Sequence, residues 1–261
     1  MFVRVTPLAL LLIAAPALAQ EQQKDAREPL RTRVYIGPQL SPKTPGATDL
    51  SFGPFIDVSR ARGDDLFDFE APDESFGFSI ADAGGFEFGP ALGFKGKRKG
   101  ADIDLPLHEV GFSFEIGAFV QTYLTPDLRI RAEARKAVSG HRGWAGEVSA
   151  DYILREGDDW LFSAGPRVTL ADGQYHRSWY GITPADSVAS GLPVFTPGGG
   201  VEGVGLALGY LRQLTPALGI AAYARYDRLV GDAASSPYTR TAGSRDQPSI
   251  GLALSYTFGG R

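Results

Sequence analysis

Large apolar side chains alternate with small or polar ones along most of this chain. The clearest case is the stretch S-I-G-L-A-L-S-Y-T-F at 249–258, where one face of a strand carries Ile250, Leu252, Leu254, Tyr256 and Phe258. The other face carries only glycine, alanine, serine and threonine. A face this apolar must pack against a second layer of protein or against lipid.

The same alternation predicts strands in nine further stretches. In one of them Leu128 and Ile130 alternate with Arg129 and Arg131, so that every second residue is charged. One lipid-compatible face and one mixed face over ~10 residues are typical of an outer-membrane strand. The stretches are 33–40, 50–58, 86–95, 110–121, 128–135, 144–152, 162–170, 204–210 and 218–227.

The connections between these stretches decide between a soluble sandwich and a membrane barrel, since alternation alone fits both. Short turns at 125–127, 155–159 and 214–216 alternate with long loops at 95–109, 171–200 and 231–246. We therefore predict an all-β, transmembrane antiparallel β-barrel with short periplasmic turns and long extracellular loops. Aromatic residues near the strand ends fit an interfacial belt: Tyr123, Tyr152, Trp160, Tyr210, Tyr226 and Tyr256.

The strand count follows from parity, because a barrel whose first and last strands meet the same rim needs an even number. Residues 65–80 fit a short hairpin that turns at Pro72-Asp73-Glu74, which brings the ten strands to twelve. Twelve is the prediction and ten the alternative. Gly-Pro pairs inside four predicted strands should form kinks or bulges, because each proline removes a ladder donor: Gly37-Pro38, Gly53-Pro54, Gly89-Pro90 and Gly165-Pro166.

The N-terminal sequence predicts export. Arg4 precedes an apolar run that ends in Ala17-Leu18-Ala19, as in a secretory signal peptide cleaved after Ala19. We therefore predict a signal peptide at 1–19, a flexible tail at 20–30 and a single outer-membrane barrel domain at 31–261. The chain has no cysteine and a formal net charge of −4, which gives no basis for nucleic-acid binding.

The candidates for chemistry are few. With no cysteine and three histidines, His108, His141 and His176, we expect no metal site and no cofactor. His141 or His176 beside an acidic loop residue could act as a general base in a barrel hydrolase. No nucleophile stands in a recognisable motif, so we favour exposed loop histidines and predict that the protein is not an enzyme, with no catalytic residues.

The charges on the predicted inner face are balanced in sign, which favours a lumen cross-linked by ion pairs over a selective pore. A narrow channel between the charged groups is the alternative. The positive residues are Arg129, Arg131, Arg135, Arg167 and Arg225, and the negative ones are Glu115, Glu133, Glu147, Asp151 and Asp227. The basic run at 95–99 predicts an exposed loop that could bind lipopolysaccharide phosphates.

Three segments resemble the MipA/OmpV family of outer-membrane proteins. They are R-L-V-G-D-A-A-S-S-P at 228–237 with G-S-R-D-Q at 243–247, Y-H-R-S-W-Y-G-I-T-P-A-D-S-V-A-S-G-L-P at 175–193, and H-R-G-W at 141–144. The ending, G-L before Y-x-F, is also similar, although three residues follow Phe258. The resemblance implies a β-barrel and, for the founding member, a scaffold that links a murein lytic transglycosylase to a peptidoglycan synthase.

The predicted function is therefore a scaffold or adaptor in cell-envelope maintenance, placed in the bacterial outer membrane. Its expected partners are outer-membrane lipid, lipopolysaccharide and, from the resemblance, the two classes of peptidoglycan enzyme. The alternatives are a narrow porin-like channel for small solutes and an outer-membrane hydrolase.

Overall fold

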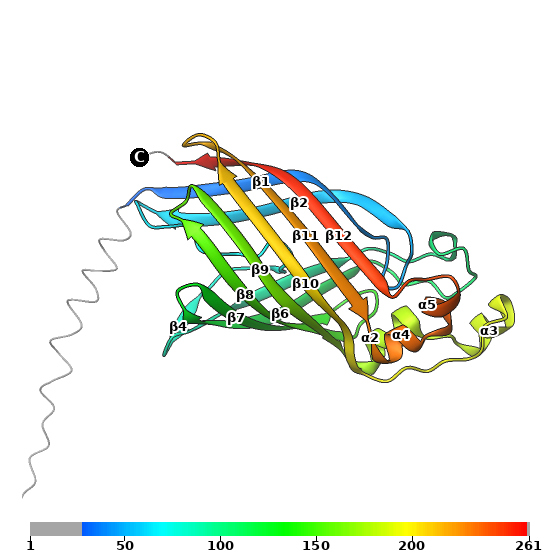
Figure 1. The fold of residues 1–261 in the computed structure, drawn as a ribbon. Helices are drawn as coiled ribbons and strands as arrows, with labels where there is room; N and C mark the ends of the chain where they lie inside the picture. Colours follow the sequence, from blue (N-terminus) through cyan, green and yellow to red (C-terminus); the bar gives the residue numbers. More distant parts are fainter. Residues whose placement is uncertain (1–27, 260–261) are drawn as a thin grey trace, which may run out of the picture.

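The computed structural model describes residues 28–259. In this part of the chain twelve strands form one sheet that curls into a nearly closed barrel (Figure 1). The strands are β1 (Leu30–Pro42), β2 (Leu50–Arg62), β3 (Phe76–Gly77), β4 (Ala81–Ala83), β5 (Phe86–Lys95), β6 (Ser113–Thr125), β7 (Leu128–Ala137), β8 (Trp144–Glu156), β9 (Trp160–Ala171), β10 (Gly200–Gln213), β11 (Leu218–Leu229) and β12 (Asp246–Phe258).

The helices are short and lie in the connections. They are the 3-10 turn η1 (Gly100–Asp102) and the α-helices α2 (Gly173–Tyr180), α3 (Pro184–Ser190), α4 (Gly231–Ser235) and α5 (Pro237–Thr241). Within residues 28–259 no helix has the length and apolar character needed to cross a membrane. The predicted signal peptide, 1–19, and most of the predicted tail, 20–30, lie outside the described residues, and β1 begins at Leu30.

All paired strands are antiparallel, in the order β2-β1-β12-β11-β10-β9-β8-β7-β6-β5-β3, with β4 also paired to β5. The tight turns at 126–127, 157–159 and 214–217 share one rim with the C-terminal end, which we call the short-turn rim. The loops at 96–112, 172–199 and 230–245 lie at the opposite, long-loop rim, where Figure 1 shows α2 to α5. The predicted antiparallel barrel of twelve strands is confirmed.

The two faces of the wall are as the alternation predicts. In β12 the side chains of Leu252 and Leu254 are 57% and 66% exposed, whereas Ala253 and Ser255 are buried. In β7 the apolar residues face outward, and Arg129 and Arg131 are buried in the interior. The exposed apolar band is the surface that an outer-membrane barrel presents to lipid.

Strands β3 and β4 lie along the same edge of β5 and form a single broken row. Phe76 faces Leu92 and Ala81 faces Phe88, so the chain follows β5 with a shift of one residue between the two short strands. Twelve strands therefore occupy eleven rows, and the two outermost rows, β2 and β3–β4, run in the same direction. No ladder joins these two rows in residues 28–259, and we call the line between them the seam.

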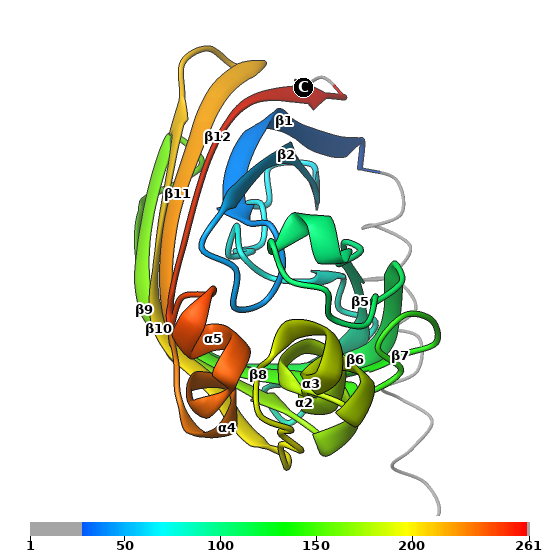
Figure 2. The same ribbon diagram turned by 90° about the vertical axis from the view of Figure 1, so that its right-hand side faces the viewer.

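The predicted hairpin turn at Pro72-Asp73-Glu74 is wrong. Residues 63–75 form no strand, and the hairpin closes instead at Gly84-Gly85, between β4 and β5. Both glycines have positive φ, 65° and 82°, which a tight turn of this kind requires. Seen from the long-loop rim, β1 and β2 form one end of the curled sheet and β5 lies near the other (Figure 2).

The four Gly-Pro pairs fall at breaks or edges of the sheet. The β1–β12 ladder is interrupted at Gly37-Pro38, and the β8–β9 ladder at Gly165-Pro166. Strands β3 and β4 separate opposite Gly89-Pro90, and Gly53-Pro54 lies on β2, whose far edge is the seam. A Cβ on Gly37 or Gly165 would lie within 1.9 Å or 1.6 Å of a carbonyl oxygen of the neighbouring strand, so only glycine fits at these kinks.

Candidate functional site in the barrel lumen

A segment between β2 and β3 fills the half of the lumen nearer the short-turn rim. We call residues 66–75 the plug segment. The side chains of Phe67 and Phe69 are 3% and 4% exposed, and the Arg33 and Arg129 guanidinium groups lie 4.0 Å and 4.4 Å from their ring centroids. Arg155 donates to the carbonyl oxygen of Phe67 at 3.0 Å. Buried rings stacked under arginines bind the segment to the inner wall.

Two carboxylates of the plug segment neutralise arginines of the wall. Asp73 accepts from Arg167 Nε at 2.8 Å and from Arg225 Nη1 at 2.9 Å. Glu74 pairs with Arg129, which also donates to Asp151 at 2.9 Å. Because a buried charge is tolerated only when it is paired, these contacts fix the position of the segment.

The ion-pair lattice predicted from the strands is present. All five predicted arginines and all five predicted carboxylates lie within ion-pair distance of a partner, as in Arg135 with Glu115 at 2.8 Å and Arg225 with Glu147 at 2.7 Å. The sequence reasoning missed Asp73 and Glu74, which it placed in a turn. A count of charges could not reveal them, because the ten strand charges already balance.

Above the plug segment lies a cavity of about 450 Å³, which we call the upper cavity. Its floor includes Asp73, Glu147 and Arg225, and its roof includes Tyr175 and Tyr180 of α2. Tyr180 donates its hydroxyl hydrogen to Glu202 Oε1 at 2.6 Å. The lumen is thus divided into a lower half in which the plug segment leaves a cavity of only about 60 Å³ and an upper half with the larger cavity.

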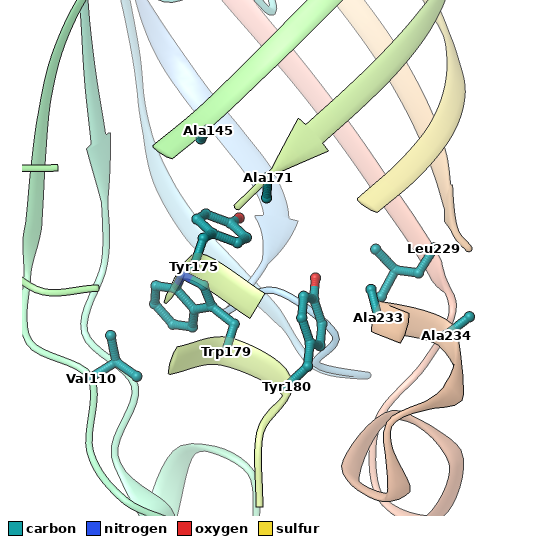
Figure 3. Close-up of a cluster of buried hydrophobic side chains, with 9 residues drawn as sticks. All are labelled: Val110, Ala145, Ala171, Tyr175, Trp179, Tyr180, Leu229, Ala233 and Ala234. Atoms are coloured by element: carbon teal, nitrogen blue, oxygen red, sulfur yellow. The ribbon is translucent and has the colours of Figure 1, made fainter. Parts of the chain in front are cut away.

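The roof of the upper cavity is an ordered cap built mainly from α2, α4 and α5. Asp172 accepts from the Tyr175 amide at 2.8 Å and so starts α2 as an N-cap residue. Tyr175 and Trp179 then lie beside each other against the ends of β8 and β9, while Tyr180 faces Ala233 of α4 (Figure 3). All three aromatic side chains are at most 1% exposed. The cap is therefore a small hydrophobic core of its own.

Polar contacts join the helices of the cap to one another. Ser236 donates to the carbonyl oxygen of Tyr180 at 2.7 Å, and the Gly198 amide donates to Asp232 at 2.6 Å. These residues belong to or flank the segments by which the chain resembles the MipA/OmpV family, 175–193 and 228–237. The resemblance on these segments therefore concerns the long-loop rim rather than the short-turn rim.

The basic run at 95–99 is not wholly the exposed loop that the sequence predicted. Arg98 is fully buried and donates to the carbonyl oxygens of Trp179, Ser178 and His108. Burial lowers the pKa of Arg98 from its ordinary value. Lys97 and Lys99 remain exposed, so only these two fit the predicted surface role.

The prediction of exposed loop histidines is wrong for His141 and His176, whose side chains are each 1% exposed. His141 Nδ1 accepts from the Gly143 amide at 3.0 Å, so Nε2 carries the proton and donates to Glu115 at 2.9 Å. His176 donates from Nδ1 to the carbonyl oxygen of Gly198 at 2.6 Å. Neither arrangement is that of a base aimed at a nucleophile.

His108 is the third histidine and lies at the edge of the cap. Its Nδ1 is 2.8 Å from Asp186 Oδ2, and its Nε2 is 3.0 Å from the carbonyl oxygen of Ser178. In residues 28–259 no serine or threonine hydroxyl hydrogen-bonds to a histidine ring nitrogen. The same residues contain no group of three or more histidine, aspartate or glutamate side chains that could hold a metal ion.

The ionisable groups of the cap are held in fixed states. Burial raises the pKa values of the Tyr175 and Tyr180 phenols well above their ordinary range, and the nearby Glu202 carboxylate raises them further. Burial alone would raise the pKa of Asp186, but hydrogen bonds from His108 and Thr183 outweigh it and lower this pKa to about 2. The cap thus has neutral phenols and an ionised Asp186 near neutral pH.

Several solved outer-membrane proteins are similar to this chain at low sequence identity. A NanC porin is 10% identical over 87% of this chain and 98% of that chain, with a TM-score of 0.38. An outer-membrane channel from Pseudomonas putida F1 is 9% identical over 88% and 96% of the two chains, also with a TM-score of 0.38. The translocator domain of the autotransporter NalP from Neisseria meningitidis is 12% identical over 94% and 97%, with a TM-score of 0.40.

No curated protein sequence matches the chain. A sequence profile of the family described as MltA-interacting protein MipA matches residues 34–258. This match extends from β1 to the last residue of β12 and so covers the whole barrel. The chain therefore belongs to the family of the MltA-interacting protein MipA.

Proposed function

We propose that this protein is a non-enzymatic scaffold of the outer membrane that binds a murein lytic transglycosylase and, through it, a peptidoglycan synthase. The description of the family as MltA-interacting supports the first partner. The observation that carries the proposal is the plug segment, because ion-paired protein across the lower half of the lumen obstructs the passage of solutes through the barrel.

The short-turn rim is the surface proposed to bind these enzymes. Since β1 begins and β12 ends at this rim, the proposal assigns it to the periplasm, where peptidoglycan is built. The rim presents the turns 126–127, 157–159 and 214–217, together with the exposed side chains of Arg60 and Arg62 at the end of β2. The cap at the opposite rim would face the cell exterior, where Lys97 and Lys99 could contact lipopolysaccharide phosphates.

Binding to a purified lytic transglycosylase tests this proposal. The mature barrel in detergent micelles would be immobilised, and the retention of the enzyme measured for three proteins: the unaltered chain, a variant with turn 214–217 replaced by Gly and Ser, and a control with the same replacement in α3. Loss of retention with the turn variant alone supports a scaffold that acts through the short-turn rim. If the unaltered barrel does not retain the enzyme, the proposal is refuted.

A narrow channel is the second candidate, and the upper cavity is the observation in its favour. Planar-bilayer recordings distinguish the two functions, because a channel should produce discrete current openings and a scaffold should produce none. A hydrolase receives no support from His141, whose ring nitrogens are both engaged by protein groups. Unchanged lipid and peptide turnover after His141→Ala or His176→Ala is therefore expected.

A further inference from the structure

The edge of β2 at the seam is adapted to remain unpaired. In the β1–β2 ladder Gly53 and Phe55 flank Pro54, which has no amide hydrogen to donate toward a further strand. The Val58 amide donates instead to the side chain of Asp57 at 2.8 Å. The carbonyl oxygen of Pro54 accepts from the Gln39 side chain at 2.8 Å. Prolines and side chains that satisfy edge groups locally prevent a strand from pairing with another.

At the long-loop rim the seam is bordered by unpaired strand ends on both sides. The row next to β5 begins with Phe76 opposite Leu92, so the end of β5 from Gly93 to Lys95 has no strand on that side. The start of β2, from Leu50 to Gly53, lies at the same rim and is also unpaired on the seam side. We call the space between these two stretches the window.

The window leads to the upper cavity. Ser41 and Ser51, from β1 and β2, line the cavity on one side of the seam. Ser75, Phe94 and Lys95 line it on the other side. The cap covers the cavity toward the long-loop rim and the plug segment lies below it. On the side that faces the membrane no ladder closes the cavity among residues 28–259, and one ion pair, Lys43 with Asp102 at 3.1 Å, joins the loops above the window.

The outer border of the window is rich in phenylalanine. The Phe52 side chain is 76% exposed on one side, and Phe94 is 55% exposed on the other. The Phe94 ring lies 6.4 Å from Phe76, 6.2 Å from Phe112 and 5.3 Å from Phe114, measured between centroids. These rings form an apolar surface that suits acyl chains rather than a water-soluble solute.

The inside of the cavity offers two charges of opposite sign that form no ion pair within 4.0 Å among the described residues, although Lys95 also interacts with Glu115 at longer range. The Lys95 ammonium lies 5.6 Å from the Tyr175 ring centroid and has no carboxylate within ion-pair distance, and Glu202 is bonded to the Tyr180 hydroxyl and to no cation. The other charged residues that line the cavity are all in ion pairs: Lys43, Asp73, Glu133, Arg135, Glu147, Arg225 and Asp227.

We propose that the window admits a zwitterionic phospholipid present in the outer leaflet of the membrane into the upper cavity. Its acyl chains stay on the phenylalanine surface, its phosphate binds Lys95 near the window, and its ammonium binds the Glu202 carboxylate. The polar head group and its water also hydrate the free edges of β2 and β5, which would otherwise face hydrocarbon unsatisfied. This site is independent of the scaffold role.

Native mass spectrometry of the detergent-solubilised protein tests the site, with phosphatidylethanolamine and phosphatidylglycerol as probes at equal concentration. We expect the zwitterionic lipid to be retained about tenfold better than the anionic one, because only it has an ammonium for Glu202. Glu202→Gln and Lys95→Gln should each weaken its retention by about tenfold, whereas Lys95→Arg should restore it.

Blocking the window provides a second test that changes no charge. Because the chain has no cysteine, Ser51→Cys can be labelled at a single place with a bulky maleimide. We expect the label to abolish lipid retention, while the same label on Val204→Cys, which is 44% exposed on the far wall, leaves it unchanged. The proposal is overturned if both lipids are retained equally, or if lipid is still retained after Ser51→Cys has been labelled. The labelling test remains decisive even if a charge variant fails to fold.

Discussion

The lower and upper halves of the lumen share the same wall but differ in how their charges are satisfied. In the lower half the plug segment supplies Asp73 and Glu74 to buried arginines, and the space is filled. In the upper half the cap contributes aromatic side chains, and Lys95 and Glu202 line the cavity without ionic partners. The connecting segments therefore decide the role of a charged side chain that faces the lumen. It stabilises the fold where a segment supplies an opposite charge, and it remains free to bind a ligand where none does.

Removal of the plug segment should have the largest effect on this contrast. Replacing residues 66–75 by an equally long Gly-Ser linker takes away the rings and carboxylates that fill the lower half. We expect planar-bilayer recordings to change from no discrete openings to discrete conductance steps. A lumen that stays silent although the variant is folded would mean that the wall side chains close it without the segment.

Breaking one lattice contact should reduce stability without opening the lumen. Asp73→Ala leaves Arg167 and Arg225 without their shared carboxylate, and the loss of a buried partner costs about 3–5 kcal/mol of unfolding free energy. Urea titration of the folded barrel, followed by heat-modifiable mobility on gels, measures the loss. Asp82→Ala, on exposed β4, is the matched control and should change little. A loss below about 1 kcal/mol at Asp73 would contradict the structural role of the lattice.

The cap should loosen locally when one of its internal bonds is removed. Ser236→Ala leaves the Tyr180 carbonyl oxygen unsatisfied in a buried place, at a cost of about 2 kcal/mol. Faster hydrogen exchange is expected in α2 and α5, with no change in the barrel strands. Ser235→Ala, at the neighbouring exposed position, should not alter exchange in α2, and a barrel-wide change in the Ser236 variant would argue against a separate cap.

The smallest effect expected is a pH dependence confined to the cap. The pKa of Asp186 is lowered to about 2 in the folded protein, so its contribution is complete above the unfolded value near 4 and is lost as the pH falls through about 2. For a loop group partly screened by water this amounts to about 1 kcal/mol. In a Trp144→Phe and Trp160→Phe background, the fluorescence emission of Trp179 should report the pH-dependent loss of cap stability between pH 5 and pH 2. Asp186→Asn should remove this pH dependence.

Much of the wall could be predicted from the sequence, because burial repeats with the period of a strand. The outward face of β12 and the paired arginines of β7 follow directly from alternation. The twelve strands were also expected, but not that β3 and β4 share one row. That arrangement depends on Pro90 interrupting the β5 edge and on the path of the chain between β2 and β3, neither of which has a periodic signal.

The contents of the lumen were largely beyond prediction, since they depend on contacts between segments far apart in sequence. Arg98 lies in a basic run typical of a solvated turn, yet its partners are carbonyl groups of α2, about eighty positions away. His141 is buried between Glu115 of β6, which is 2.9 Å from its Nε2, and Tyr175 of α2, whose ring centroid is 4.7 Å from that of the imidazole. The sequence shows which residues are available for such contacts, but not which of them contact each other in the folded protein.

The attachment of the first hairpin has a consequence for how the protein is completed. Among the described residues, strands β1 and β2 are joined by ladders to the remaining wall through β12, with Val34 opposite Tyr256, because the far side of β2 is the seam. In chain order this hairpin comes first, whereas the strand with which it pairs comes last. A chain that stops before residue 246 therefore lacks the ladder that holds its first two strands to the wall.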